Sequence, residues 1–292
     1  MDYEKEISLR VEKIKTIFQA AKEFASIEPD LSVILKHLDT TDNEFCSIAY
    51  EGASMGIALR DLEQVGTLSD WRLFNDKAEA HAAQTHAGLG WALAQTNHPV
   101  SALLKTFSPL LRFRVLDGYG YYEGVFRQRT SIKAQNTPGV FEDWMLKAYD
   151  QGIGRSIWYS CKGDIQKVRE MISTFTTDRQ SSLWVGIGVA CSYVGGCNRD
   201  LLKLLQIIAG TYHDELAIGT ILAARSRILA NSRLSDVELA CQTLCKLSAK
   251  EAMLLSVKAE PATYKNVNDS YNLWLLNIQK RLPVNHDVNI IK

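Results

Sequence analysis

The segment VLDGYGYYEGVFR, residues 115–127, holds the densest group of polar and aromatic side chains in the sequence. Its members with chemical potential are Asp117, Tyr119, Tyr121, Tyr122, Glu123 and Arg127. A carboxylate in an aromatic pocket has a raised pKa, because burial disfavours its charged form, and such a group suits acid–base catalysis. Glu123 and Arg127 are also four residues apart, so the alternative is an ordinary helical ion pair beside core tyrosines.

A second candidate is the segment GASMG, residues 52–56, which matches the G-x-S-x-G pattern of a nucleophile elbow and would make Ser54 a hydrolase nucleophile. The preceding FCSIAY could serve as the strand that such an elbow requires. No alternation of strands and helices follows, however, and small residues at helical spacing explain this segment equally well. A hydrolase is therefore the least favoured hypothesis.

Histidines and cysteines give little support for a metal site. His81 and His86 are five residues apart, about 140° around a helix, so they do not share a face. The six cysteines include no CxxC pair and lie in apolar surroundings, which favours buried reduced thiols. We expect neither a metal nor a cofactor.

Glycine pairs recur along the chain at a nearly constant interval. Gly-x-Gly begins at Gly118, Gly152 and Gly186, 34 residues apart each time, and Gly88 lies 30 residues before the first. A dinucleotide-binding fingerprint occurs once, between a strand and a helix, so this recurrence argues against nucleotide binding. A period near 34 residues with helical patterning is typical of stacked helix pairs.

Glycine inside a helix costs about 1 kcal/mol relative to alanine, so the repeated pairs need a compensating contact. Residues i and i+2 point about 200° apart on a helix, and two such glycines thin it on opposite sides. The pairs therefore predict helices that are approached closely by a neighbour on each flank, or helix starts in which the first glycine belongs to a turn. Glu51, Asp117 and Gln151 each precede the first glycine of a unit, so equivalent positions would align them on one surface.

We therefore expect an all-α fold, an α-solenoid-like superhelical stack of helix pairs with the length of tetratricopeptide repeats. Residues 1–45 would form N-terminal capping helices, 46–283 the helical-repeat domain and 284–292 a loose tail, in one continuous domain.

Composition excludes two classes of partner. Lysine plus arginine equals aspartate plus glutamate at 33 each, so no basic field exists to hold nucleic acid. The longest nearly apolar run, Leu183–Cys197, has 15 residues, short of the roughly 20 that a bilayer requires. The N-terminal residues are charged throughout and have no signal-peptide pattern. We expect a cytoplasmic protein without a membrane span.

Several motifs taken together resemble the DUF1702 family, uncharacterised proteins encoded in bacterial enediyne and related polyketide gene clusters. The motifs are YEGASMGIAL, HAGLGWALA, VLDGYGYYEGVF, DQGIGRSIWY and LWVGIGVACSYVGG. The family motif Asp-Gly-Tyr-Gly, an aromatic, His, Glu-Gly is matched at Asp117 and Glu123, while Tyr122 stands where His is common. His86 matches the family's histidine before its Gly-x-Gly. The resemblance implies a role in making a natural product.

Our leading hypothesis is a protein that binds a hydrophobic polyene- or polyketide-like intermediate in a concave face or central tunnel and folds, cyclises or isomerises it. Glu123 or Asp117 would act as acid or base, with His86 as proton partner. The side chains expected to contact the ligand are Glu51, Trp91, Tyr119, Tyr121, Tyr122, Arg127, Gln151 and Arg155. The alternative is a non-catalytic helical-repeat scaffold that holds other biosynthetic proteins.

Overall fold

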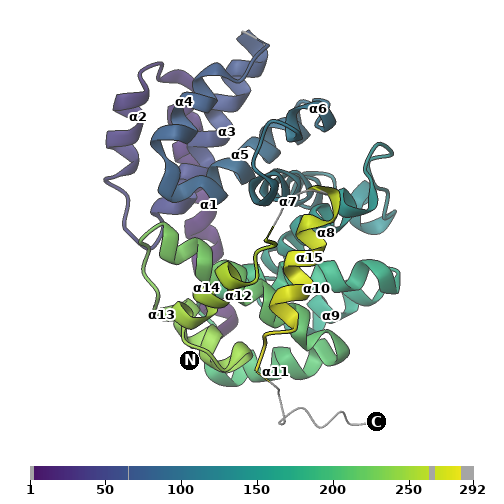
Figure 1. The fold of residues 1–292 in the computed structure, drawn as a ribbon. Coiled ribbons are helices and arrows are strands. Elements are labelled where there is room, and N and C mark those ends of the chain that lie inside the picture. Colours follow the sequence, from purple (N-terminus) through teal and green to yellow (C-terminus); the bar gives the residue numbers. More distant parts are fainter. Residues whose placement is uncertain (1–2, 65, 263–266, 284–292) are drawn as a thin grey trace.

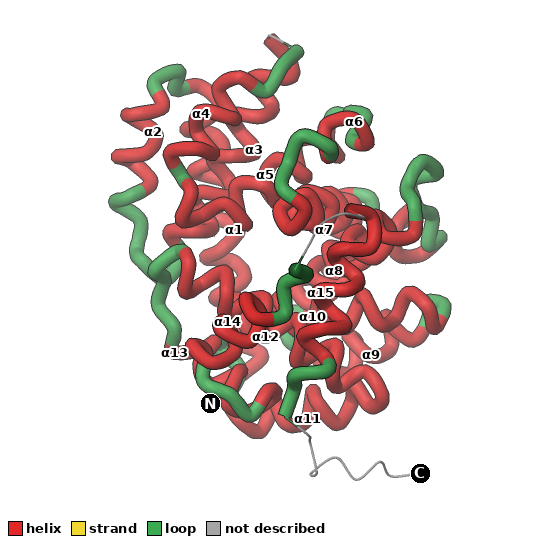
Figure 2. The backbone as a smooth tube through the Cα atoms, in the orientation of Figure 1, coloured by secondary structure: helices red, strands yellow, loops and turns green. Residues whose placement is uncertain are grey.

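The computed structural model describes residues 3–64, 66–262 and 267–283, which are built from helices and contain no strand (Figure 2). The α-helices are α1 (Tyr3–Ile27), α2 (Leu31–Leu38), α3 (Cys46–Gln64), α4 (Ser69–Lys77), α5 (Ala82–Gln95), α6 (Ser101–Leu104), α7 (Pro109–Phe126), α8 (Asp143–Cys161), α9 (Ile165–Ser173), α10 (Thr177–Val194), α11 (Arg199–Ala209), α12 (His213–Leu229), α13 (Ser235–Ala240), α14 (Ala249–Lys258) and α15 (Val267–Gln279). Single 3₁₀ or π turns lie at Glu79–His81, Arg129–Lys133, Gly210–Tyr212 and Cys241–Cys245. The all-α prediction is confirmed.

Long helices pack side by side in chain order, from α1 through α3, α5, α7, α8 and α10 to α12 (Figure 1). Shorter helices connect them and cover their outer sides. Helices α3, α5, α7, α8 and α10 are buried over most of their surface, and in α10 every residue from Ser182 to Val194 is buried, whereas α1 has an exposed side. A helix that is apolar on all sides must lie inside a stack, so this pattern confirms the predicted repeat of inner and outer helices.

The recurring glycines are the points at which these inner helices touch. A Cβ built on Gly118 would lie 2.0 Å from the carbonyl oxygen of Ala87 in α5, and one on Gly120 would lie 2.0 Å from that of Tyr149 in α8. The two glycines of α7 thus face neighbours on opposite flanks. The same arrangement recurs at Gly152 and Gly154 of α8. Close approach, and not a turn at the helix start, is therefore why each pair is glycine.

The contacts also follow the repeat register. The first glycine of a pair meets the residue that precedes the first glycine one unit earlier: Gly152 meets Asp117, and Gly186 meets Gln151. Glycine Cα–H groups directed at carbonyl oxygens form weak hydrogen bonds at close helix contacts. Every unit therefore repeats one backbone-to-backbone contact, which holds equivalent side chains in line.

Residues in the range 1–45 form α1 and α2. Helix α1 packs on α3 through Gly52 and Gly56, whose Cβ positions would meet the carbonyl oxygens of Phe18 and Lys22. It therefore joins the stack in the same way as the later inner helices. The predicted loose tail, residues 284–292, lies outside the described residues. Among the described helices, none combines the length and apolar character that a bilayer-spanning segment requires.

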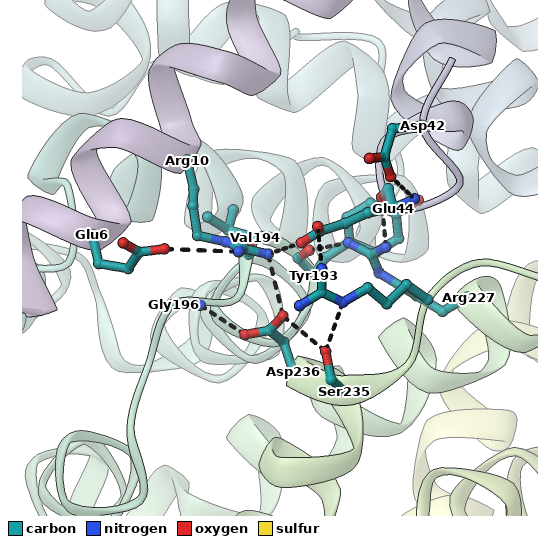
Figure 3. Close-up of polar contacts among 11 residues, drawn as sticks. Glu6, Arg10, Asp42, Glu44, Tyr193, Val194, Gly196, Arg227, Ser235 and Asp236 are labelled. Atoms are coloured by element: carbon teal, nitrogen blue, oxygen red, sulfur yellow. Dashed lines mark hydrogen bonds and ion pairs between the residues drawn. The ribbon is translucent and has the colours of Figure 1, made fainter. Parts of the chain in front are cut away.

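Contacts between the two ends of the stack close it on itself. Figure 3 shows Arg10 of α1, Glu44 of the α2–α3 loop and Asp236 of α13 pointing toward one another, and Arg10 is ion-paired with both acids. Arg227 of α12 donates hydrogen bonds to the carbonyl oxygens of Glu44, at 2.7 Å, and Tyr193. The inner helices therefore surround an interior space instead of forming an open superhelix.

Candidate functional site

The interior space is a cavity of about 730 Å³, within the range of small-molecule sites. Its walls come from α3, α5, α7, α8, α10 and α12, with α15 completing them. Lining residues that are half-buried or exposed mark where it opens, and they include both apolar and polar side chains: Glu79, Ser108, Leu110, Leu111, Leu222, Arg225, Leu229 and Glu260. Buried polar residues mark its inner end: Glu51, Gln84, Asp117, Gln151, Arg155, Tyr159 and Tyr193.

The inner side chains occupy equivalent positions relative to the first glycine of each repeat unit. Glu51, Asp117 and Gln151 each precede the first glycine of their helix, and all three line the cavity. Arg155 lies three residues after its glycine, and Tyr159 lies seven after it. Because the glycine contacts hold successive helices in one register, side chains from distant segments converge at one level.

A buried ion-pair network occupies the inner end. Oδ2 of Asp117 accepts from Nη1 of Arg155 at 2.9 Å and also from Arg114. Nη2 of Arg155 lies 3.6 Å from Oε1 of Glu51. Side-chain exposures are 3% for Asp117, 5% for Glu51 and 8% for Arg155. Asp117, Glu51 and Arg155 thus compensate one another away from solvent, as buried charges must, and the half-buried Arg114 adds a second positive charge beside Asp117.

Burial and pairing shift the protonation of this network. Burial raises the pKa of Glu51, and the nearby charges of Arg155 and Arg114 oppose that rise only in part. For Arg155, burial alone would lower the pKa, but the carboxylates of Asp117 and Glu51 outweigh it and raise the pKa. Glu51 is therefore a carboxyl group able to take up a proton more readily than an exposed glutamate, beside a permanent cation.

Three buried polar atoms at the inner end have no hydrogen-bond partner among the described residues: Oδ1 of Asp117, Oε1 of Gln84 and Nε2 of Gln151. Their other polar atoms are engaged. Nε2 of Gln84 donates to the Tyr193 hydroxyl at 3.1 Å, and Oε1 of Gln151 accepts from the Tyr271 hydroxyl of α15. All three residues line the cavity. Because unsatisfied buried polar groups are costly, this set indicates a site that holds a polar group of a ligand.

Of the sequence-predicted residues, the structure brings Glu51, Asp117, Gln151 and Arg155 together in the cavity wall. Tyr121 and Trp91 do not line the cavity but lie next to the ion-pair network. The guanidinium of Arg155 lies 4.8 Å from the Tyr121 ring, and that ring is 4.7 Å from Trp91. These two aromatic residues therefore support Arg155 from outside the cavity.

The rest of the aromatic and acidic motif lies away from the cavity wall. Glu123 pairs with Arg127 at 2.5 Å, the helical ion pair of our alternative interpretation, although burial still raises the pKa of Glu123. Tyr119 packs on Phe141 at 5.6 Å, and Tyr122 packs on Phe126 and under the Arg127 guanidinium. In a helix the side chains of Asp117 and Glu123 point in different directions. Asp117 therefore faces the cavity, whereas Glu123 faces away from it.

His86 lies in an aromatic packing cluster outside the cavity wall. Its ring makes edge contacts with Trp71 and Phe107 at 5.3 and 5.0 Å, and its Nδ1 lies 2.8 Å from the carbonyl oxygen of Ala82. Burial lowers its pKa to about 4. His86 is therefore an uncharged packing residue at neutral pH, and the structure does not bring it together with Asp117 in the cavity.

The remaining candidates are also structural. Ser54 is fully buried, accepts from the Trp71 indole at 2.8 Å and donates to the Thr85 carbonyl, so it has neither exposure nor a base. His81 contacts Ser47 and stacks on Tyr50. All six cysteines are free, five of them buried, as predicted. Within the described part of the chain, no three His, Cys, Asp or Glu side chains are grouped as metal ligands would be.

The sequence analysis did not predict several residues that line the cavity. Their positions relative to the first glycine of each unit would have identified most of those named below. Gln84 and Arg114 each lie four residues before the first glycine of their helix, and Tyr159 and Tyr193 each lie seven after it. Comparing the positions four residues before and seven residues after the first glycine in every unit would have predicted two further rows of side chains facing the cavity. Tyr271 comes from α15, which returns over the stack, and no periodic signal marks it.

Comparison with known proteins gives one match. The family model described as "Protein of unknown function (DUF1702)" matches residues 2–282, in agreement with the resemblance drawn from the motifs. No curated protein and no solved structure matches the chain. Functional inference therefore depends on the geometry of the site itself.

Proposed function

Since the chain belongs to the DUF1702 family, whose description assigns no activity, we propose its function from the cavity: it binds a hydrophobic polyene- or polyketide-like intermediate of natural-product biosynthesis and isomerises or cyclises it. The observation that carries this proposal is a cavity of about 730 Å³, open at one end, with largely apolar walls and one buried charged end. A few convergent polar groups in a mostly apolar cavity are typical of small-molecule sites.

Glu51 takes the acid–base role in this proposal, in place of Glu123 and His86. It lines the cavity, its pKa is raised by burial, and Arg155 lies 3.6 Å from its carboxylate. Asp117 orients Arg155 through Oδ2 and offers Oδ1 to the substrate. Gln151 offers its free amide N–H to a substrate carbonyl oxygen.

The chemistry that fits this arrangement is proton transfer next to a carbonyl group. Glu51 removes a proton from a carbon conjugated with the carbonyl, and the Gln151 amide stabilises the enolate oxygen that forms. Returning the same proton to another carbon of the conjugated system shifts the double bond. If the enolate instead attacks a second carbonyl, a ring closes and Glu51 delivers the proton to the new alkoxide. Both outcomes conserve atoms and electrons without an added reactant.

The alternative of a non-catalytic scaffold would use an open concave surface for its partners. Closure of the stack by Arg10, Glu44 and Arg227 leaves a cavity with one opening instead, which favours a small ligand over a peptide or protein in the interior.

Two measurements test the proposal. Native mass spectrometry of the purified protein is expected to detect an apolar molecule that is lost in Ala83→Trp, where the indole would project into the cavity and obstruct it, and kept in Ala20→Trp, an exposed helical control. In the producing host, Glu51→Gln is expected to lower product titre at least tenfold. An unchanged titre with folded Glu51→Gln protein would contradict the acid–base role, and equal ligand occupancy in Ala83→Trp would contradict binding in the cavity.

A further inference from the structure

The charges lining the cavity are already matched within the protein. Arg114 and Arg155 are bound to Asp117, and Arg225 pairs with Glu260 at 2.7 Å. The lining contains three arginines and four carboxylates, the fourth being Glu79 near the opening. No lining arginine is therefore left for an anionic ligand, and a carboxylate or phosphate group would meet excess negative charge.

The groups left without partners are specific in kind. Oδ1 of Asp117 and Oε1 of Gln84 are acceptors, and Nε2 of Gln151 is a donor. A ligand that satisfies all three presents two hydroxyl-type donors and one acceptor oxygen. Each of the three residues is at most 3% exposed, so a mismatch would leave a buried polar atom unpaired.

The unpaired polar atoms and the leucine side chains of the lining lie at different depths, and the opening also carries Glu79 and the Arg225–Glu260 ion pair. The acceptors and the donor belong to its buried inner end, while Leu110, Leu111, Leu222 and Leu229 lie toward the opening. A ligand with one polar end would consequently enter with that end first and leave its apolar chain toward the opening.

We propose, building on the function above, that the cavity selects uncharged ligands with a hydroxylated carbonyl head at the inner end and an apolar chain toward the opening, and that Gln84, Asp117 and Gln151 determine this selection. This is the chemistry of a dihydroxy ketone or a neutral dihydroxy ester, and it excludes free fatty acids and phosphate esters of the same chain length.

Binding of four probes with twelve-carbon chains tests this by calorimetry and by quenching of tryptophan fluorescence, to which Trp274 in the cavity wall contributes. The probes are 1-monododecanoylglycerol, dodecyl acetate, dodecanoate and dodecyl phosphate. The glycerol ester carries a carbonyl and two hydroxyls, and dodecyl acetate keeps only the carbonyl. We expect the glycerol ester to bind at least tenfold more tightly than either anion, and about three- to tenfold more tightly than dodecyl acetate.

Single-residue variants test whether Gln84 and Gln151 are responsible for the preference among the probes. Gln84→Ala is expected to reduce the advantage of the glycerol ester over dodecyl acetate, since only the Asp117 acceptor remains, and Gln151→Ala to weaken both esters about three- to tenfold. Gln166→Ala, on the exposed side of α9, serves as the matched control. The comparison of probes on the unmodified protein decides the question even if a variant does not fold.

The outcomes separate the two proposals. If dodecanoate or dodecyl phosphate binds as tightly as the glycerol ester and Ala83→Trp abolishes that binding, the cavity binds ligands and the inference about the head group is wrong. If no probe binds, or if Ala83→Trp changes nothing, the inference and the proposed function are both wrong.

Discussion

Gly152 of α8 packs directly on the main-chain carbonyl of Asp117 in α7: a Cβ at that glycine would lie 2.0 Å from the carbonyl oxygen. The side chain of the same aspartate faces the cavity and binds Arg155, one turn beyond the glycine. The contact that sets the spacing of two helices therefore also sets the distance between the members of the ion-pair network.

Gly152→Ala is expected to destabilise the protein by about 2 kcal/mol. Overpacking costs about 1–3 kcal/mol, more where the obstacle is rigid backbone, and loss of a helical glycine returns up to about 1 kcal/mol. Urea unfolding measures the difference. Gly139→Ala is the control, because nothing lies within 4 Å of its Cβ position. Equal stabilities of the two variants would show that the helices do not approach as closely as described.

Replacing Glu51 with glutamine is expected to change how stability depends on pH. The raised pKa of Glu51 means that the folded state holds its proton above pH 4.5, where the unfolded chain releases it. Stability of the native sequence relative to Glu51→Gln should therefore fall as pH rises from 4.5 through the folded-state pKa. Unfolding both proteins across this range tests it. A constant difference, or one of opposite slope, would show that Glu51 is not a tuned acid–base group.

His86→Phe is expected to make the protein less sensitive to acid. His86 has a pKa of about 4 when folded against an ordinary value of 6.5, so the unfolded state binds more protons in between and stability falls as pH drops through this window. The shift corresponds to about 3 kcal/mol, which Phe should remove while keeping the edge contacts with Trp71 and Phe107. Thermal unfolding at pH 6.5 and pH 4.5 measures the loss, with exposed His98→Gln as control. Equal acid sensitivity in native protein and His86→Phe would indicate an exposed or charged imidazole.

Arg227→Lys is expected to cost about 2 kcal/mol and to weaken ligand binding. The guanidinium joins the carbonyl oxygens of Glu44 and Tyr193 and lies 4.2 Å from the Tyr193 ring, and an ammonium cannot make these contacts together. Tyr193 lines the cavity, so its displacement would alter the site. Calorimetric unfolding and probe binding are the measurements. Arg233→Lys, 55% exposed and paired with the same Glu44, should change stability by less than about 1 kcal/mol. If Arg227→Lys and Arg233→Lys changed stability by similar amounts, the contacts that close the stack would depend on positive charge and not on the geometry of the Arg227 guanidinium.

The sequence contained most of the local architecture. The spacing of Gly88, Gly118, Gly152 and Gly186 predicted the stack. The i,i+2 pairing left two uses open, contacts on both flanks or a turn at the helix start, and the structure shows the first. The position before the first glycine likewise led to Glu51, Asp117 and Gln151.

Long-range features were out of reach. Periodicity gives the neighbours of a helix but not the accumulated rotation that brings Arg227 to Glu44, 183 residues away. The site was therefore assigned partly to Glu123 and His86, which share segments with lining residues but face other surroundings. The prediction grouped these residues because they belong to one motif with similar chemistry, and it gave too little weight to the direction in which each side chain leaves the helix. Only the closed arrangement of the helices shows which directions lead into the cavity.

Closure by contacts such as that of Arg227 with Glu44 has a consequence for biosynthesis of the protein itself. During translation, α1 to α10 can stack as they emerge, and Arg10 of α1 can already reach the carbonyl oxygen of Val194, yet the part of the cavity wall that α12 supplies is missing until that helix has been made. A chain that ended before residue 213 would retain much of its helical content and be unable to retain a small molecule. Ligand retention therefore reports on completion of the chain more sensitively than circular dichroism does.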